Sequence, residues 1–135
     1  MNFSKTASYS LNILSFMATH EDAMMSAALL NEKLHIPYPY LRQILLNLSK
    51  RGLIHSVRGR NGGYVFSRLK EEISLADIID ATDGIDSLNK CILGFSECPF
   101  NNDGCSMHGI WEDTRNQIIK VLKETSLADI SRIRK

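Results

Sequence analysis

Residues 36–66 read IPYPYLRQILLNLSKRGLIHSVRGRNGGYVF, and most of what can be said about the fold follows from them. In the first half, apolar residues recur at the spacing of one helix face: Leu41, Ile44, Leu45 and Leu48. This predicts a helix over 39–51, with proline acceptable in its first turn and Gly52 placed to end it. Three polar residues lie off the apolar face and are expected to point outward: Arg42, Gln43 and Asn47.

The second half predicts a β-hairpin. Residues 53–57 and 64–66 are rich in apolar, β-branched and aromatic side chains, and a Gly/Asn-rich turn separates them. Upstream, apolar spacing predicts a helix over 4–20, and Ser26 can cap a shorter helix over 27–34, which Pro37 ends. The order helix, turn, helix, hairpin is that of a winged helix-turn-helix. The expected fold is mainly α with a small β-hairpin.

Downstream of the hairpin, the segment SLADI occurs twice, beginning at Ser74 and at Ser126. A serine followed three residues later by an acid is a typical helix start, so we interpret the two copies as two similar helix caps and not as an internal repeat. Residues 84–106 predict a loop. A long helix is expected from Ser106 to about Glu124.

This long helix carries an apolar stripe: Met107, Ile110, Trp111, Ile118, Ile119, Val121 and Leu122. The stripe favours a dimer interface, while the alternative is that it covers the core of its own domain. We therefore divide the chain into a DNA-binding domain over 1–83, a loop over 84–106, and a dimerisation helix with a C-terminal helix over 107–135.

The charges are unevenly distributed along the chain. Net charge is only +1, yet residues 33–70 contain eight of the 16 basic residues and none of the 15 acidic ones. This segment would attract a phosphate backbone while the rest of the chain repels it, which orients an encounter with nucleic acid. The alternative is a basic face that serves only solubility.

Two groups of residues are candidates for reading double-stranded DNA. Tyr40, Arg42 and Gln43 lie near the N-terminal end of the third helix, which recognition helices present to base edges. In the turn, glycines permit close approach to a groove, and Arg58, Gly59 and Arg60 form a candidate wing. The remaining basic residues nearby are assigned to phosphate contact or solubility: Lys50, Arg51, Arg68 and Lys70.

Other classes of function find little support in the sequence. No apolar run approaches the length of a membrane helix, and the first residues do not resemble a signal peptide, so we expect a cytoplasmic protein with no membrane partner. A glycine-rich phosphate loop is not supported, because no Gly-Lys-Ser/Thr follows the turn. We find no nucleophile–base pair and no paired carboxylates, and we do not expect an enzyme.

A second candidate site lies in the predicted loop. Cys91, Cys98 and Cys105 are evenly spaced, and His108 follows closely. Structural zinc sites usually contain tight C-x2-C pairs, which are absent, whereas three thiolates and an imidazole suit an iron–sulfur cluster. The spacing leaves three possibilities open: an iron–sulfur cluster, a zinc site, or unligated or redox-active cysteines.

The combination of these stretches resembles the IscR/NsrR family of bacterial iron–sulfur winged-helix regulators over essentially the whole chain. The matching segments are FSKTASYSLNIL, IPYPYLRQILLNLSKRGLIHSVRGRNGGY, EEISLADIIDATDG, the three-cysteine loop, CSMHGIW and TSLADI. In the wing, Arg60 and Asn61 replace a more glycine-rich family pattern, Arg42 stands where many members have Glu, and Pro39 replaces a small polar residue.

The resemblance implies a homodimer that binds a near-palindromic operator and whose DNA binding depends on a cluster. The cysteines match the family's ligands, and His108 matches the histidine ligand of the iron–sulfur-assembly branch. The nitric-oxide-sensing branch uses an acid from the first helix of the partner, but this chain has no Asp, Glu or Cys before Glu21.

The expected cofactor is a 2Fe–2S cluster, with 4Fe–4S as the alternative. The expected function is a regulator, a repressor, that responds to iron–sulfur status, redox state or nitric oxide; the alternative regulator works without a cluster, through cysteine oxidation or zinc.

Overall fold

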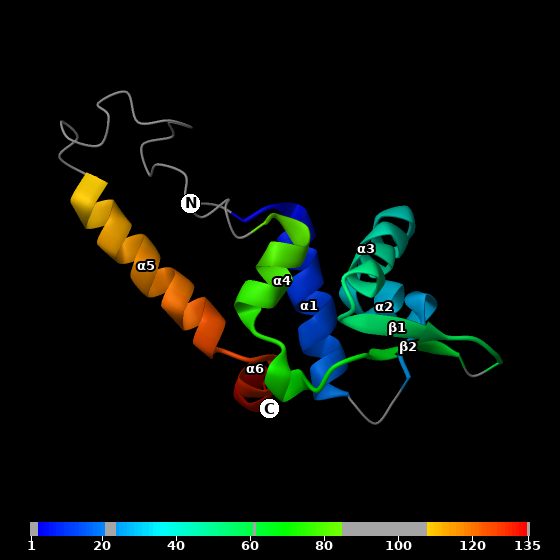
Figure 1. Cartoon of the computed structure of the whole chain (residues 1–135). Helices are drawn as coiled ribbons and strands as arrows, with labels where there is room; N and C mark the ends of the chain where they lie inside the picture. Colours follow the sequence, from blue (N-terminus) through cyan, green and yellow to red (C-terminus); the bar gives the residue numbers. More distant parts are fainter. Residues whose placement is uncertain (1–2, 21–23, 61, 85–107, 135) are drawn as a thin grey trace.

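The computed structural model describes residues 3–20, 24–60, 62–84 and 108–134 (Figure 1). The elements in chain order are α1 (Lys5–Thr19), α2 (Ala27–Leu34), α3 (Tyr38–Lys50), β1 (Ile54–Val57), β2 (Gly63–Phe66), the 3-10 turn η1 (Lys70–Glu72), α4 (Leu75–Thr82), α5 (His108–Glu124) and α6 (Leu127–Arg134). The expected fold, mainly helical with one two-stranded antiparallel hairpin, is confirmed. None of the described helices is both long and apolar enough to cross a bilayer.

The main core forms around α1. Helices α2, α3, α4 and α6 and the base of the hairpin contribute fully buried aliphatic side chains to it, including Ile13, Leu14, Leu30, Leu41, Leu45, Leu48, Ile54, Ile78 and Leu127. Each such side chain stabilises the fold by about 1.5–3 kcal/mol when it leaves water. Helix α6, although last in the chain, therefore belongs to the same core as α1.

Serine side chains cap the first two helices. The backbone N–H of Ala7 donates to the hydroxyl of Ser4, and that of Leu29 donates to the hydroxyl of Ser26, each at 3.1 Å. Ser4 also binds the end of α4, because its backbone N–H donates to Asp83 Oδ2 at 3.0 Å and its hydroxyl donates to Oδ1. These contacts fix where α1 starts and join it to the last turn of α4.

The turn between α2 and α3 depends on an unusual backbone conformation. His35 ends α2 in the left-handed region, with φ 56°, and its N–H donates to the carbonyl of Asn31 at 2.9 Å. The Asn31 side-chain amide donates to the carbonyl of Ile36 at 2.6 Å, and the Ile36 side chain is buried. Together these contacts set the angle at which α3 leaves α2.

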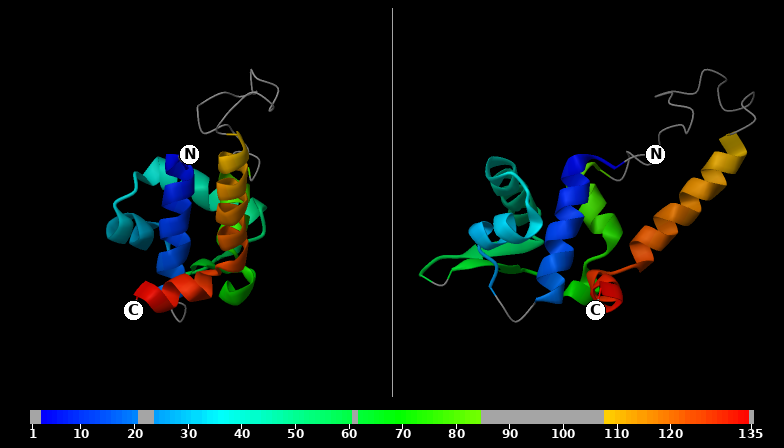
Figure 2. Two further views of the ribbon diagram at one scale, coloured as in Figure 1. Left: turned by 90° about the vertical axis from the view of Figure 1, so that its left-hand side faces the viewer. Right: turned by 180° about the vertical axis from the view of Figure 1, so that it is seen from behind.

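The two strands of the hairpin pair with each other, and the free edge of β2 also pairs with a residue that precedes α2. Ile54 pairs with Phe66 and Val57 pairs with Gly63, in antiparallel register. On the other edge of β2, the N–H of Tyr64 donates to the carbonyl of Met25 at 2.7 Å. This extra bridge attaches the hairpin to the segment that precedes α2, while the tip extends beyond the helices (Figures 1 and 2).

The two SLADI segments lie against each other. In each, the serine hydroxyl accepts the N–H of the acid, and the acid accepts the N–H of the serine, at 3.0–3.2 Å. The N–H of Leu75 donates to the carbonyl of Thr125, and that of Leu127 donates to the carbonyl of Ile73, both at 2.9 Å. The two helix caps were expected as separate features; in the structure their pairing also docks α6 beside α4.

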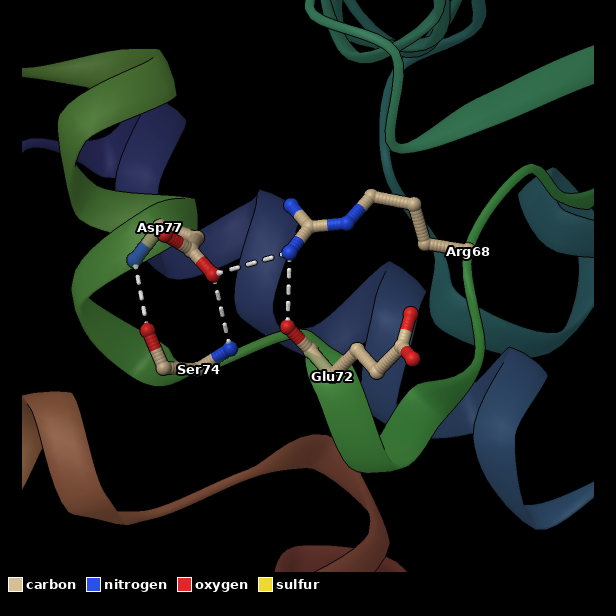
Figure 3. A network of polar contacts seen from close by, with 4 residues as sticks. All are labelled: Arg68, Glu72, Ser74 and Asp77. Atoms are coloured by element: carbon tan, nitrogen blue, oxygen red, sulfur yellow. Dashed lines mark hydrogen bonds and ion pairs between the residues drawn. The ribbon is translucent and has the colours of Figure 1, made fainter.

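A polar network connects β2 to the start of α4 (Figure 3). The guanidinium of Arg68 donates to the backbone carbonyl of Glu72 at 2.8 Å, and its Nη2 lies 3.8 Å from Oδ2 of Asp77. Asp77 is the acid of the first capping box. Arg68, assigned from the sequence to phosphate contact or solubility, therefore also holds the connection after β2 in place.

The C-terminal half of helix α5 packs against α4. Leu122 is buried with Ala76 and Ile79 of α4, and Ile118 and Ile119 pack against the same cluster. Toward its N-terminus, α5 points away from the other helices (Figure 1). The predicted apolar stripe is thus divided: one part covers α4 of the same chain, whereas Ile110 and Val121 are 63% and 59% exposed.

We expect His35→Gly to raise the free energy of unfolding by about 0.5–1 kcal/mol, because glycine adopts the left-handed region without the penalty that a Cβ imposes. Urea denaturation monitored by circular dichroism measures this. His35→Ala keeps the Cβ and serves as the matched control, for which no gain is expected. Equal gains in both variants would show that the His35 backbone conformation is not strained.

Asp129 should make the free energy of unfolding depend on pH in the acid range. The backbone N–H and the hydroxyl of Ser126 hold the pKa of the Asp129 carboxyl below its usual range, and Arg132 acts in the same direction. Because the folded pKa is lowered, this contribution is fully present above the unfolded value of about 3.9 and is lost as the pH falls below it. Asp129→Asn should therefore lose less stability than the parent when urea unfolding is compared at pH 7 and pH 3. If Asp129→Asn lost as much free energy of unfolding between pH 7 and pH 3 as the parent does, this prediction would be contradicted.

Candidate nucleic-acid interface

Helix α3 presents one buried face and one exposed face. Its buried residues Leu41, Ile44, Leu45 and Leu48 fix its rotation about its own axis. As expected, Arg42 and Gln43 are exposed on the other side. An arginine can bond guanine O6 and N7, and a glutamine can bond adenine N6 and N7, when the helix that carries them lies in the major groove.

Arg42 is oriented by an aromatic neighbour that the sequence reasoning did not single out. Its guanidinium carbon lies 5.9 Å from the centroid of the Tyr38 ring, one helical turn earlier. A cation–π contact at an exposed position contributes about 0.5–1 kcal/mol. The i, i+4 spacing of Tyr38 and Arg42 could have indicated this pair from the sequence.

The candidate Tyr40 and the polar residue Asn47, both on α3, turn toward α1 and α4. The Tyr40 hydroxyl lies 2.6 Å from Thr6 Oγ1, and its ring meets that of Tyr9 edge-on at 5.5 Å. The side-chain amide of Asn47 donates to the carbonyl of Ala81 at 2.9 Å, so the expectation that Asn47 points outward was wrong. With Gln43 and Arg51, these residues line a shallow cleft of about 330 Å³ between the three helices.

The candidate wing residues Arg58, Gly59 and Arg60 are all exposed at the end of the hairpin. Gly59 has φ 128°, a conformation that favours glycine, and its carbonyl accepts the N–H of Gly62 at 3.0 Å. A Cβ on Gly62 would lie 2.2 Å from the carbonyl oxygen of Val57. The turn itself therefore requires these two glycines, independently of any approach to a groove.

Helix α3 and the hairpin lie at one end of the molecule, and both carry exposed basic side chains. Arg42 and Lys50 on α3 and Arg58 and Arg60 on the hairpin are exposed, and no acidic residue occurs between residues 33 and 70. Helix α5 projects at the opposite end (Figures 1 and 2). A polyanion would therefore meet α3 and the hairpin together.

The candidate metal ligands are only partly within the described structure. Cys91, Cys98 and Cys105 lie outside the described residues, and His108 is the first residue of α5, with a side chain that is likewise not described. Within the described ranges, no three His, Cys, Asp or Glu side chains form a group that could hold a metal ion.

Comparison with known proteins identifies relatives along almost the whole chain. An HTH-type transcriptional regulator of Aquifex aeolicus is 31% identical over 98% of this chain and 93% of its own length. The HTH-type transcriptional regulator IscR of Photorhabdus laumondii is 30% identical over 96% of this chain and 79% of its own length. Both relatives are described as transcriptional regulators and not as enzymes.

A solved structure has the same fold. CymR, the global cysteine regulator of B. subtilis, superposes with a TM-score of 0.81 at 25% identity, covering 98% of both chains. The Rrf2 family, described as an iron-dependent transcriptional regulator, matches residues 3–133. The resemblance to IscR-type regulators is thereby confirmed at the level of the family: the chain belongs to the Rrf2 family of helix-turn-helix transcriptional regulators.

Proposed function

We propose that this protein represses transcription by binding an operator with α3 in the major groove and the hairpin tip in the adjacent minor groove. The observation that carries the proposal is that Arg42 and Gln43 are exposed on α3 and Arg58 and Arg60 are exposed on the hairpin, two elements at the same end of the molecule (Figure 1). Arg42 and Gln43 would contact base edges. Arginines at the tip of a hairpin suit the negative potential of a narrow minor groove.

We further propose that two copies bind a near-palindromic operator. Ile110 and Val121 on α5 are more than half exposed, whereas Ile118, Ile119 and Leu122 of the predicted stripe pack on α4. Covering these two side chains with a second copy of α5 would place the two α3 helices at the outer ends of the dimer, as symmetric half-sites require. As a regulator of a bacterial chromosome, the protein would act in the cytoplasm.

The residues proposed to sense the signal are Cys91, Cys98, Cys105 and His108. Three thiolates and one imidazole within 18 residues form a donor set that fits an iron–sulfur cluster, in which histidine can replace cysteine on one iron. Helix α1 contains no acid that could act as the alternative ligand. We therefore favour a 2Fe–2S cluster, with 4Fe–4S as the alternative. When bound, the cluster supplies a centre that reacts to oxidants, nitric oxide or iron supply.

A second candidate is a regulator without a cluster, which responds through cysteine oxidation or zinc. The similarity to CymR, a cysteine regulator, favours this alternative. The same three cysteines would then act as thiols whose oxidation changes DNA binding. Anaerobic purification, with iron, sulfide and zinc analysis, distinguishes the two candidates.

We expect Arg42→Ala to weaken binding to the operator by about 1–3 kcal/mol and to relax one base position, because a bidentate guanine contact is lost. Arg60→Ala should weaken binding to all sequences and reduce the salt dependence. DNA selection with the purified protein, followed by titration at several salt concentrations, measures both effects. Lys120→Ala, an exposed cation on α5, is the control and should bind as the parent does. If Arg42→Ala weakened all sequences equally, Arg42 would be a phosphate contact.

Each Cys→Ser change at residues 91, 98 and 105 should abolish the visible absorption of anaerobically purified protein, because each thiolate is a ligand. His108→Ala should change the absorption spectrum, whereas His35→Ala, an exposed histidine at the end of α2, should leave it unchanged. Sedimentation of the same samples should show a dimer throughout, since α5 carries the proposed interface. Stoichiometric zinc without iron from iron-replete cells would refute the cluster and support the second candidate.

A further inference from the structure

A third side chain on the outward face of α3 lacks a structural reason for its exposure. Leu46 is 56% exposed, although its neighbours Leu45 and Leu48 are fully buried. A single exposed leucine is ordinary on a protein surface. The position of Leu46 relative to the candidate base-reading residues is therefore what matters.

Leu46 follows Arg42 by four residues and Gln43 by three. At 3.6 residues per turn, the side chains at 39, 42, 43 and 46 lie within about 100° of the helix circumference. Their spacing of i, i+3, i+4 and i+7 is that of the base-reading positions of the homeodomain recognition helix. If Arg42 and Gln43 face base edges, Leu46 faces them too.

An aliphatic side chain at such a position has one specific partner among the base edges. In the major groove, the C5-methyl group of thymine is the apolar feature, and apolar side chains recognise thymine through it. The other surface residues of α3 fit different roles, since Asn47 is bonded to Ala81 and Lys50 is a cation suited to phosphate.

We infer that Leu46 is a specificity-determining residue that contacts the C5-methyl of a thymine, next to the bases contacted by Arg42 and Gln43. This inference rests on the proposed function, because it requires α3 to lie in the major groove. It assigns the operator a thymine in each half-site, on the side toward which the C-terminal half of α3 points.

The experiment removes the methyl group from DNA and the side chain from the protein. An operator obtained by selection with the full-length protein is synthesised with each thymine replaced in turn by deoxyuridine, which keeps all base-pair hydrogen bonds. At one position in each half-site, the parent should lose about fourfold in affinity, as expected for one methyl group no longer buried. Leu46→Ala should bind more weakly but should show no effect of deoxyuridine at that position.

Leu69→Ala is the matched control, because Leu69 is 62% exposed but lies between β2 and η1, away from α3. It should keep the full sensitivity to deoxyuridine. Leu46→Met, which retains an apolar side chain, should keep most of it. Circular dichroism and sedimentation of each variant report whether fold and oligomeric state are unchanged.

Several results would overturn the inference. The first is equal sensitivity to deoxyuridine in the parent and in Leu46→Ala, and the second is a parent that is insensitive at every thymine. In a third, Leu46→Ala changes the oligomeric state, which would assign Leu46 to a protein interface. All three leave sequence-selective binding by the parent intact, whereas a parent that selects no sequence would also remove the proposed function.

Discussion

The apolar face of α3 is the constraint on which the rest of the proposed interface depends. Leu41, Leu45 and Leu48 are fully buried against the core around α1, so the helix cannot rotate about its axis without exposing them. A rotation that exposed even one of them would cost about 1.5–3 kcal/mol. The outward direction of Arg42 and Gln43 is therefore a consequence of the hydrophobic core, and the contact of Arg42 with the Tyr38 ring adds to it.

Much of this arrangement could be predicted from the sequence, because hydrophobic spacing and capping residues act locally. Ser4, Ser26, Ser74 and Ser126 each begin a helix in the structure where the sequence predicted one. The hairpin followed from the apolar runs around a glycine-rich turn. These features need no knowledge of distant contacts, since each involves residues within one or two turns of the chain.

Features that depend on contacts between distant residues could not be predicted. Asn47 lies off the apolar face of α3 and yet donates to Ala81, thirty-four residues away. The pairing of Leu75 with Thr125 joins segments fifty residues apart, and the sequence shows only that both segments suit a helix start. Arg68 appeared to be one more cation in a basic segment until the fold brought it next to Asp77. Whether the predicted ligands Cys91, Cys98 and Cys105 meet remains a prediction, because they lie outside the described residues.

The last turn of α4 connects the candidate DNA-reading helix to the segment that carries the cysteines. Ala81 accepts a hydrogen bond from Asn47 of α3, and Asp83 accepts two from Ser4 at the start of α1. The next residue, Gly84, directly precedes the segment that carries the cysteines. A ligand bound beyond Gly84 changes DNA affinity if it binds unequally to two states of the protein that differ in DNA affinity, and these contacts are one place where such states could differ. Because Asn47 lies on the same helix as Arg42 and Gln43, a small displacement at Ala81 would act on the reading helix through the Asn47 side chain. Regulation by this route requires the end of α4 to have two arrangements, whereas a second route runs through α5, whose C-terminal half packs on α4.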